Sequence, residues 1–425
     1  MAPSITHRDV WNLGALYASL GINAAVSLGM IGYLARVLGT QGWGLILLTQ
    51  AFGYWTAMLP EYGFTLSASR DIAQAKTASR QAQLASSVVW AKVALSALVI
   101  PVALVCYLAI PSFRQHPVFL LGGVAFGIAQ GMDPIWLFQG IERQFLYGLI
   151  ASTGRITTLL LVLLLVHGPG DGWLVMFLQS AGAIVVFTAG MIFLRFHLPP
   201  TKTSRTHVWG VLLGGWKVFQ YRGAQGLTAN SSVLILGMVS PPSVNAFGSA
   251  DRIMRNWIGL LGPLASAGLP KIARLLGHDA KAARGTARLL LAVTFGFGVV
   301  SSSMLLIFTP QVVSLILGPG YGFVVPVLRV SAVALPLAAL SNMLGVQGLL
   351  PLGLDATLVR ITLAAGVMNA AGCALFGAMF GAMGAAVTVV AIEAGMVVSF
   401  TFVLRRTGGP DLNEGSTARA AMERL

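Results

Sequence analysis

Long apolar runs recur along the whole chain, and they constrain its fold more than any other feature. A helix needs about 20 apolar residues to cross a bilayer, whereas a barrel strand needs about half as many. The runs are therefore too long for a barrel, and helices satisfy their own backbone groups in lipid. The sequence predicts an all-α polytopic membrane protein with about twelve transmembrane helices. The candidate spans are residues 12–35, 42–66, 87–110, 118–140, 145–166, 173–194, 211–239, 244–268, 289–309, 322–350, 357–380 and 383–404.

The composition excludes several other classes of protein. Hydrophobic residues make up 56% of the chain and charged residues only 9%, whereas soluble domains carry about 25% charged residues. A soluble enzyme, a disordered chain and a classical nucleic-acid-binding domain are thus excluded, and no nucleic-acid partner is expected. Both cysteines, Cys106 and Cys373, lie inside apolar runs. Neither a disulfide framework nor a thiolate metal site is expected from them.

Lysine and arginine are concentrated in the loops on one side of the predicted bilayer. The opposite loops contain only Arg36 and Arg114. Because cytoplasmic loops are enriched in basic residues, both termini are expected in the cytoplasm. Topology then explains most of the net charge of +14. The basic residues of the cytoplasmic side are Arg8, Arg70, Lys76, Arg80, Arg143, Arg195, Lys202, Arg205, Lys271, Arg274, Lys281, Arg284, Arg288, Arg360, Arg405, Arg406, Arg419 and Arg424.

A polar stretch near the middle of the chain divides the predicted spans into two equal sets. We therefore expect an amino-terminal six-helix bundle in residues 1–198, a cytoplasmic linker in 199–210 and a carboxyl-terminal six-helix bundle in 211–405. An even number of spans in each half is typical of parallel repeats. Residues 406–425, which begin with a Gly-Gly-Pro-containing stretch, are expected to form a disordered cytoplasmic tail.

Two cytoplasmic joints, residues 69–86 and 271–288, have an amphipathic pattern. One interpretation is a helix that binds anionic lipid headgroups, so anionic membrane lipid is a candidate partner. The other interpretation, which we favour, is a solvated connector helix.

Charged residues inside the predicted spans indicate where function resides. Each costs about 2.5–3.5 kcal/mol near the bilayer centre, so such residues tend to line a hydrated interior. Arginine dominates the set, and its guanidinium forms bidentate bonds with phosphate. A cationic interior predicts an anionic, phosphate-bearing substrate. The candidate substrate-binding residues are Arg155, Arg222, Arg252, Arg255 and Arg329, and the ion-coupling candidates are Asp133, Glu393 and Glu61.

Structural roles for the same charges remain open. Asp251 and Arg255 have the i, i+4 spacing of a helical ion pair, and Glu393 could neutralise one arginine. Lys92 and Lys217 lie near the cytoplasmic ends of their spans, so we expect both to extend their ammonium groups to the membrane surface.

No catalytic motif accompanies these charges. All six histidines fall in predicted loops or the amino-terminal tail, and no Walker, GxSxG or HExxH motif occurs. The sequence therefore predicts a protein that is not an enzyme, with no catalytic residues, no metal and no cofactor. Without a nucleotide site, energy would come from an ion gradient or from the substrate gradient.

Several stretches resemble one known family. They are Leu34–Gly44 (LARVLGTQGWG), Tyr62–Phe64 with Ser67–Ala73 (SASRDIA), Pro134–Arg143 (PIWLFQGIER), and Phe247 with Ala250–Ile253 (ADRI) and Pro263. They are similar to motifs of the polysaccharide-biosynthesis flippases, which move O-antigen or exopolysaccharide units and belong to the multidrug/oligosaccharidyl-lipid/polysaccharide exporter superfamily. The chain lacks the two extra helices of the related lipid II flippases.

The resemblance implies two bundles in a V around a central cavity, with alternating access. It implies that an undecaprenyl pyrophosphate-linked oligosaccharide repeat unit is moved from the inner to the outer leaflet of the bacterial inner membrane. A polysaccharide polymerase and a chain-length regulator are then expected partners, and the protein itself is expected to be a monomer. Two alternatives differ from this reading. An ion-coupled multidrug or metabolite exporter of the same superfamily would need an acid-dominated cavity, and a membrane glycan polymerase or ligase would need a long outer loop.

Overall fold

The computed structural model describes residues 7–199, 201, 203–259 and 280–406, which are largely helical and contain no strand. The first half contains α1 (His7–Glu61), α2 (Phe64–Gln74), α3 (Ala78–Ser96), α4 (Val99–Ala109), α5 (Pro111–Gln115), α6 (Pro117–Gly131), α7 (Ile135–Gly140), α8 (Gln144–Leu165), η1 (Pro169–Asp171) and α9 (Gly172–His197). The second half contains α10 (Arg205–Val239), η2 (Pro241–Ser243), α11 (Val244–Gly259), α13 (Ala280–Ile316), α14 (Val324–Ala332), α15 (Ala334–Asn342), the π-helix η3 (Met343–Leu349), η4 (Leu350–Leu352) and α16 (Asp355–Arg406).

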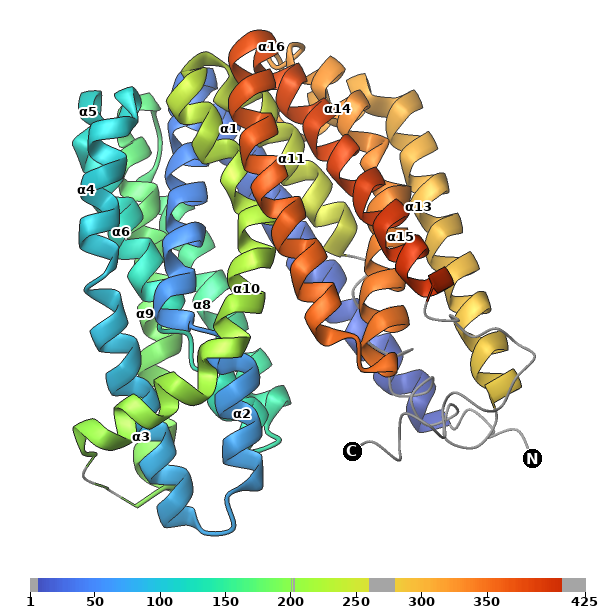
Figure 1. The fold of residues 1–425 in the computed structure, drawn as a ribbon. Coiled ribbons are helices and arrows are strands. Elements are labelled where there is room, and N and C mark those ends of the chain that lie inside the picture. The colour runs from blue at the N-terminus through green and yellow to red at the C-terminus, as the bar shows by residue number, and fades with distance from the viewer. Residues whose placement is uncertain (1–6, 200, 202, 260–279, 407–425) are drawn as a thin grey trace.

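The helices form two groups that meet at one end and diverge at the other (Figure 1). In the first group, here the amino lobe, α6 packs against α1, α4 and α9, and α9 packs against α8. In the second, here the carboxyl lobe, α14, α15 and α16 pack together with α13 and α11. We refer to the two ends as the narrow end and the wide end. The loops after α5 and at the turn within α16 lie at the narrow end, whereas α2 and α3 lie at the wide end.

The apolar cores explain this V shape. One large core joins the lobes, since it contains Leu34 and Leu38 of α1, Phe247 of α11 and Leu328 of α14. Two smaller cores are separate from it. One lies around Phe64, Ile72 and Trp136 in the amino lobe, and the other around Leu349, Leu358 and Phe400 in the carboxyl lobe. The lobes thus share buried apolar surface toward the narrow end and have independent cores toward the wide end.

Two glycines reverse the chain between pairs of predicted spans. Gly39 (φ 67°, ψ −177°) interrupts α1, and Gly381 (φ 58°, ψ −134°) interrupts α16. Side chains with a Cβ rarely adopt such backbone angles, so glycine fits these turns. Each long helix is therefore two successive helices, as the separate runs 12–35 and 42–66, and 357–380 and 383–404, predict.

Several predicted spans are divided between separate elements, which the apolar pattern did not indicate, and two of these breaks lie beside the charged candidates Glu61 and Asp133. The carboxyl-terminal boundary predicted for span 42–66 was wrong. Helix α1 ends at Glu61, and the chain turns through Tyr62 (φ 48°) and Gly63 (φ 76°). Span 118–140 divides into α6 and α7 around Asp133 and Pro134. Proline lacks an amide hydrogen, so it cannot continue the α6 hydrogen-bond ladder.

Seven helices of the described chain are long and apolar enough to cross a membrane, judged by length and composition. The total of about twelve stays a prediction. Helices α1, α10 and α11 fall outside those seven, and all three line the cavities described below. Most of the joint predicted at 271–288, residue Pro263 and the tail after Arg406 lie outside the described residues.

Helix α10 contacts both lobes. Its first part packs into the amino-lobe core through Val208 and Phe219, and the Phe219 ring stacks on Tyr62 with 4.6 Å between ring centres. Its later part packs along α16. The bundle boundary expected at residue 211 therefore remains a prediction, with α10 as the helix that joins the bundles.

Candidate substrate cavities

Two adjoining cavities lie among the helices that carry the intramembrane charges. The amino-lobe cavity, of about 480 Å³, is enclosed by α1, α6, α8, α9 and α11. The central cavity, of about 740 Å³, lies between the lobes and is enclosed by α1, α10, α11, α14, α15 and α16. Both volumes fall within the usual range for small-molecule sites. The residues that line both cavities are Tyr54, Gln130, Asp133, Tyr147 and Arg255.

Three of the predicted arginines converge on the amino-lobe cavity. Arg155 comes from α8, and Arg252 and Arg255 come from α11. Asp133 is the only acidic residue in the described lining of this cavity. The amino-lobe cavity is consequently cationic, as the sequence predicts for the substrate site.

Arg252 is held in place by polar and aromatic neighbours. Its guanidinium donates a hydrogen bond to Gln50 Oε1 and lies 5.4 Å from the centre of the Tyr54 ring. The Gln50 amide in turn donates to Gln179 Oε1 at 3.1 Å. A cation held over an aromatic face and fixed by an amide loses little further freedom when it binds an anion.

Arg255 forms the helical ion pair that its spacing predicts. Its Nε lies 2.6 Å from Asp251 Oδ2, and both side chains remain partly exposed to the cavities. Because a guanidinium has five N–H donors, this pair leaves donors for other groups. The predicted pairing is therefore confirmed, and it coexists with a position at the border of both cavities.

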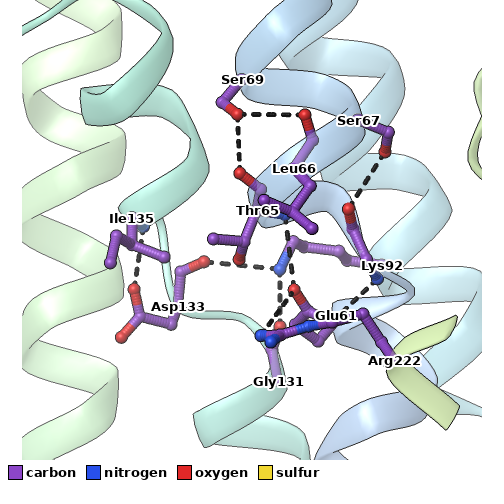
Figure 2. Close-up of polar contacts among 11 residues, drawn as sticks. Glu61, Thr65, Leu66, Ser67, Ser69, Lys92, Gly131, Asp133, Ile135 and Arg222 are labelled. Atoms are coloured by element: carbon purple, nitrogen blue, oxygen red, sulfur yellow. Dashed lines mark hydrogen bonds and ion pairs between the residues drawn. The ribbon is translucent and has the colours of Figure 1, made fainter. Parts of the chain in front are cut away.

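The central cavity has a different charge balance. Its described lining includes the acids Glu61, Asp133, Asp251 and Glu393 and the bases Arg222 and Arg255. Arg222 Nη2 lies 3.9 Å from Glu61 Oε1, and the Glu61 carboxylate also accepts a hydrogen bond of 2.8 Å from the Gly63 amide (Figure 2). Arg222 thus belongs to a loose ion pair in the central cavity and not to the arginine cluster.

Asp133 and Glu393 accept hydrogen bonds from neutral donors. The Asp133 carboxylate accepts from the Ile135 amide and from the Tyr147 hydroxyl, each at 2.8 Å. The Glu393 carboxylate accepts from Ser341 Oγ at 2.6 Å. The ion pairs of the described residues involve neither carboxylate. Glu393 therefore forms no ion pair with an arginine of the described residues, and the alternative that it neutralises one was wrong.

Lys92 does not reach the membrane surface, so that prediction was wrong. Its side chain is buried, and Nζ donates to the Gly131 carbonyl at 2.6 Å and to the Asp133 carbonyl at 3.4 Å (Figure 2). These carbonyls become available because the helix is interrupted before Pro134. The Asp-Pro dipeptide inside an apolar run was the signal for this site.

Arg329 stands apart from the other candidates. It lies on α14, is exposed, and belongs to the described lining of neither cavity.

Sequence reasoning missed the amides of the amino-lobe cavity, namely Gln50, Gln130, Gln179 and Asn256. Their signal was polar side chains within apolar runs, which a search for charges alone does not find.

Known proteins resemble this chain over most of its length. A family model described as polysaccharide biosynthesis protein matches residues 10–276. A relative from Escherichia coli (strain K12) that bears the name O-antigen transporter is 29% identical over 383 residues, covering 88% of this chain and 91% of the relative. A relative of the same name from Shigella dysenteriae is 21% identical over 361 residues, covering 84% and 90%.

Solved structures of similar fold are membrane transporters. An inward-facing multidrug resistance MATE family transporter of the MOP superfamily matches with a TM-score of 0.69 and 16% identity, covering 92% of this chain and 95% of the other. The lipid II flippase MurJ in an inward closed conformation matches with a TM-score of 0.65 and 13% identity, covering 89% and 87%. The all-α membrane fold is thereby confirmed, and the match of the family model shows that this chain belongs to the polysaccharide biosynthesis protein family.

Proposed function

We propose that this protein flips an undecaprenyl pyrophosphate-linked oligosaccharide repeat unit from the inner to the outer leaflet of the bacterial inner membrane. The observation that carries the proposal is the convergence of Arg155, Arg252 and Arg255 on one cavity whose described lining has Asp133 as its single acid. Arginine stays charged at any physiological pH and binds phosphate through two parallel hydrogen bonds. The names of the relatives, O-antigen transporters, support a glycan as cargo.

The transport cycle is alternating access between the two ends of the V. At the narrow end, hydrogen bonds join the lobes: Tyr321 donates to the Ala35 carbonyl at 2.7 Å, and Trp43 Nε1 donates to Ser249 Oγ at 2.9 Å. The wide end is assigned to the cytoplasm, since the basic joint between α2 and α3 lies there (Figure 1). The cavities in this conformation would then receive substrate from the inner leaflet.

Asp133 and Glu393 are the proposed coupling groups. Both line the central cavity, and both accept hydrogen bonds from neutral donors. Lys92 and Arg155 lie near Asp133, but the ion pairs of the described residues include neither Asp133 nor Glu393. A carboxylate that is not held in an ion pair can bind and release a proton or a sodium ion during transport. Glu61 is already paired with Arg222, so its proposed contribution is to exchange that partner when substrate enters. A polymerase, a chain-length regulator and anionic lipid remain the proposed partners of a monomer.

Deletion of the gene tests the proposal. Surface polysaccharide should disappear, and lipid-linked repeat units should accumulate in the inner leaflet. Wild-type protein should restore the polysaccharide, and protein with Arg155→Gln, Arg252→Gln and Arg255→Gln together should not. Normal surface polysaccharide in the deletion strain would contradict the proposal.

One observation favours a second function, export of organic cations. The described lining of the central cavity contains four acids and two arginines. Proteoliposomes that accumulate a cationic dye, in a manner that depends on Glu393, would establish this function.

A further inference from the structure

The amino-lobe cavity combines its arginines with four amide side chains in its described lining. Gln50, Gln130, Gln179 and Asn256 line it together with the hydroxyl of Thr158. Amides offer both donors and acceptors, which matches the hydroxyl groups of a sugar. The described lining of the central cavity also has four amides, Gln130, Gln225, Asn230 and Asn342, but its charged groups are mostly carboxylates. The two cavities therefore differ in charge, and only the amino-lobe cavity places amides beside a cluster of arginines.

Two of these amides are available to a ligand. The side-chain amide of Gln130 makes no hydrogen bond to any residue that the structure describes, and Gln179 uses its side-chain oxygen as the acceptor for Gln50. The nitrogen of Gln179 has no acceptor within the same described residues. A polar group enclosed in a cavity is stabilised when a ligand supplies its missing hydrogen bonds.

The position of the pyrophosphate limits where the first sugar lies. In the proposed substrate this sugar is attached directly to the pyrophosphate. If Arg155, Arg252 and Arg255 hold the pyrophosphate, the sugar must lie in the same cavity or at its border. Gln130 lies at the border of both cavities, and Gln179 is linked to the Arg252 site through Gln50.

We infer that Gln130 and Gln179 form a subsite for the sugar attached to the pyrophosphate. In this subsite the two amides form hydrogen bonds with the hydroxyl or acetamido groups of that sugar. The inference rests on the proposed function and adds a place for the first sugar. It assigns specificity for the first sugar to the amino lobe and not to the central cavity.

Binding of two lipids to the purified protein tests the subsite. The probes are undecaprenyl pyrophosphate and undecaprenyl pyrophosphate that carries one N-acetylhexosamine. Wild-type protein should bind the sugar-bearing lipid more tightly. Gln130→Met and Gln179→Met should each reduce this preference by about 3–10-fold, because each removes hydrogen bonds to the sugar. Both variants should bind the sugar-free lipid as wild type does.

Two further variants locate the sugar and separate the possible failures. Arg255→Gln should weaken binding of both lipids equally. Gln225→Met is the control for the central cavity, where the Gln225 amide donates a hydrogen bond to the Tyr221 hydroxyl. Gln179 lines the amino-lobe cavity and not the described part of the central one, so it decides between them. If Gln225→Met lowers the sugar preference and Gln179→Met does not, the subsite is in the central cavity and the inference is overturned. Equal binding of the two lipids by wild-type protein would also overturn it.

Failure of the proposed function gives a different result. Wild-type protein would then bind neither pyrophosphate lipid more tightly than undecaprenol. Melting temperatures of the purified variants exclude unfolding as the cause of lost binding. Gln130→Met is the more robust variant, since its amide has no hydrogen bond to lose within the described residues.

Discussion

The charged residues predicted to bind substrate occupy different positions in the structure. Arg155, Arg252 and Arg255 gather at one cavity, whereas Arg222 is paired with Glu61. Arg329, on α14, is not in the described lining of either cavity. Depth in the membrane predicted that these residues matter, but only the packing of α8 against α9 and of α11 against α1 determines which of them meet.

The arginine cluster gives the first prediction. Arg255→Gln should reduce transport of the lipid-linked glycan by about 10–100-fold, because a charge-assisted hydrogen bond to phosphate contributes roughly 1.5–3 kcal/mol. Arg329→Gln is the matched control and should transport at the wild-type rate. Initial rates in proteoliposomes measure both. A larger loss for Arg329→Gln than for Arg255→Gln would contradict the assignment.

Lys92 gives the second prediction. Lys92→Met should lower the free energy of unfolding by about 1–3 kcal/mol, because it leaves the Gly131 and Asp133 carbonyls without their buried donor. Lys217 is exposed, so Lys217→Met should leave stability unchanged. Thermal unfolding in detergent compares the two variants. Equal melting temperatures would mean that water satisfies the carbonyls.

At the scale of helices, the apolar pattern predicted most of the fold. Every predicted span overlaps a described helix, and the reversals at Gly39 and Gly381 fall between predicted spans. The pattern could not predict the turn at Tyr62 or the interruption at Asp133, because apolar residues continue through both. It also could not predict that α10 contacts both lobes, since that depends on tertiary packing.

The glycine turn in α1 gives the third prediction. Gly39 and Gly29 both have open space where a Cβ would stand, and only Gly39 has a positive φ. Gly39→Ala should therefore destabilise the protein by about 1–3 kcal/mol, and Gly29→Ala should not. Yield and melting temperature of the two variants provide the measurement. A similar effect of both substitutions would show that backbone strain is not the reason for glycine at residue 39.

At the scale of the whole molecule, the shared core and the hydrogen bonds of the narrow end hold the lobes together. The separate cores of the wide end allow the lobes to move apart or together there. Alternating access requires the narrow end to open, so the contacts at that end set the population of the outward-open state.

Tyr321 gives the fourth prediction. Tyr321→Phe removes the hydrogen bond to the Ala35 carbonyl and should raise the outward-open population about 2–10-fold. A cysteine at Ala183, which lines the amino-lobe cavity, reports this opening in a background without Cys106 and Cys373. An impermeant thiol reagent added outside intact cells should label it faster in the Tyr321→Phe background. Unchanged labelling would mean that this bond does not hold the narrow end closed.

The most direct test of the proposed function is flipping by purified protein. Liposomes would carry undecaprenyl pyrophosphate linked to a fluorescent glycan, and an impermeant quencher would report the leaflet that holds the label. Wild-type protein should make the inner-leaflet label accessible, and the variant with Arg155→Gln, Arg252→Gln and Arg255→Gln should leave it protected as in protein-free liposomes. Flipping by that variant at the wild-type rate would contradict the arginine site, and absence of flipping by wild-type protein would contradict the proposed function itself.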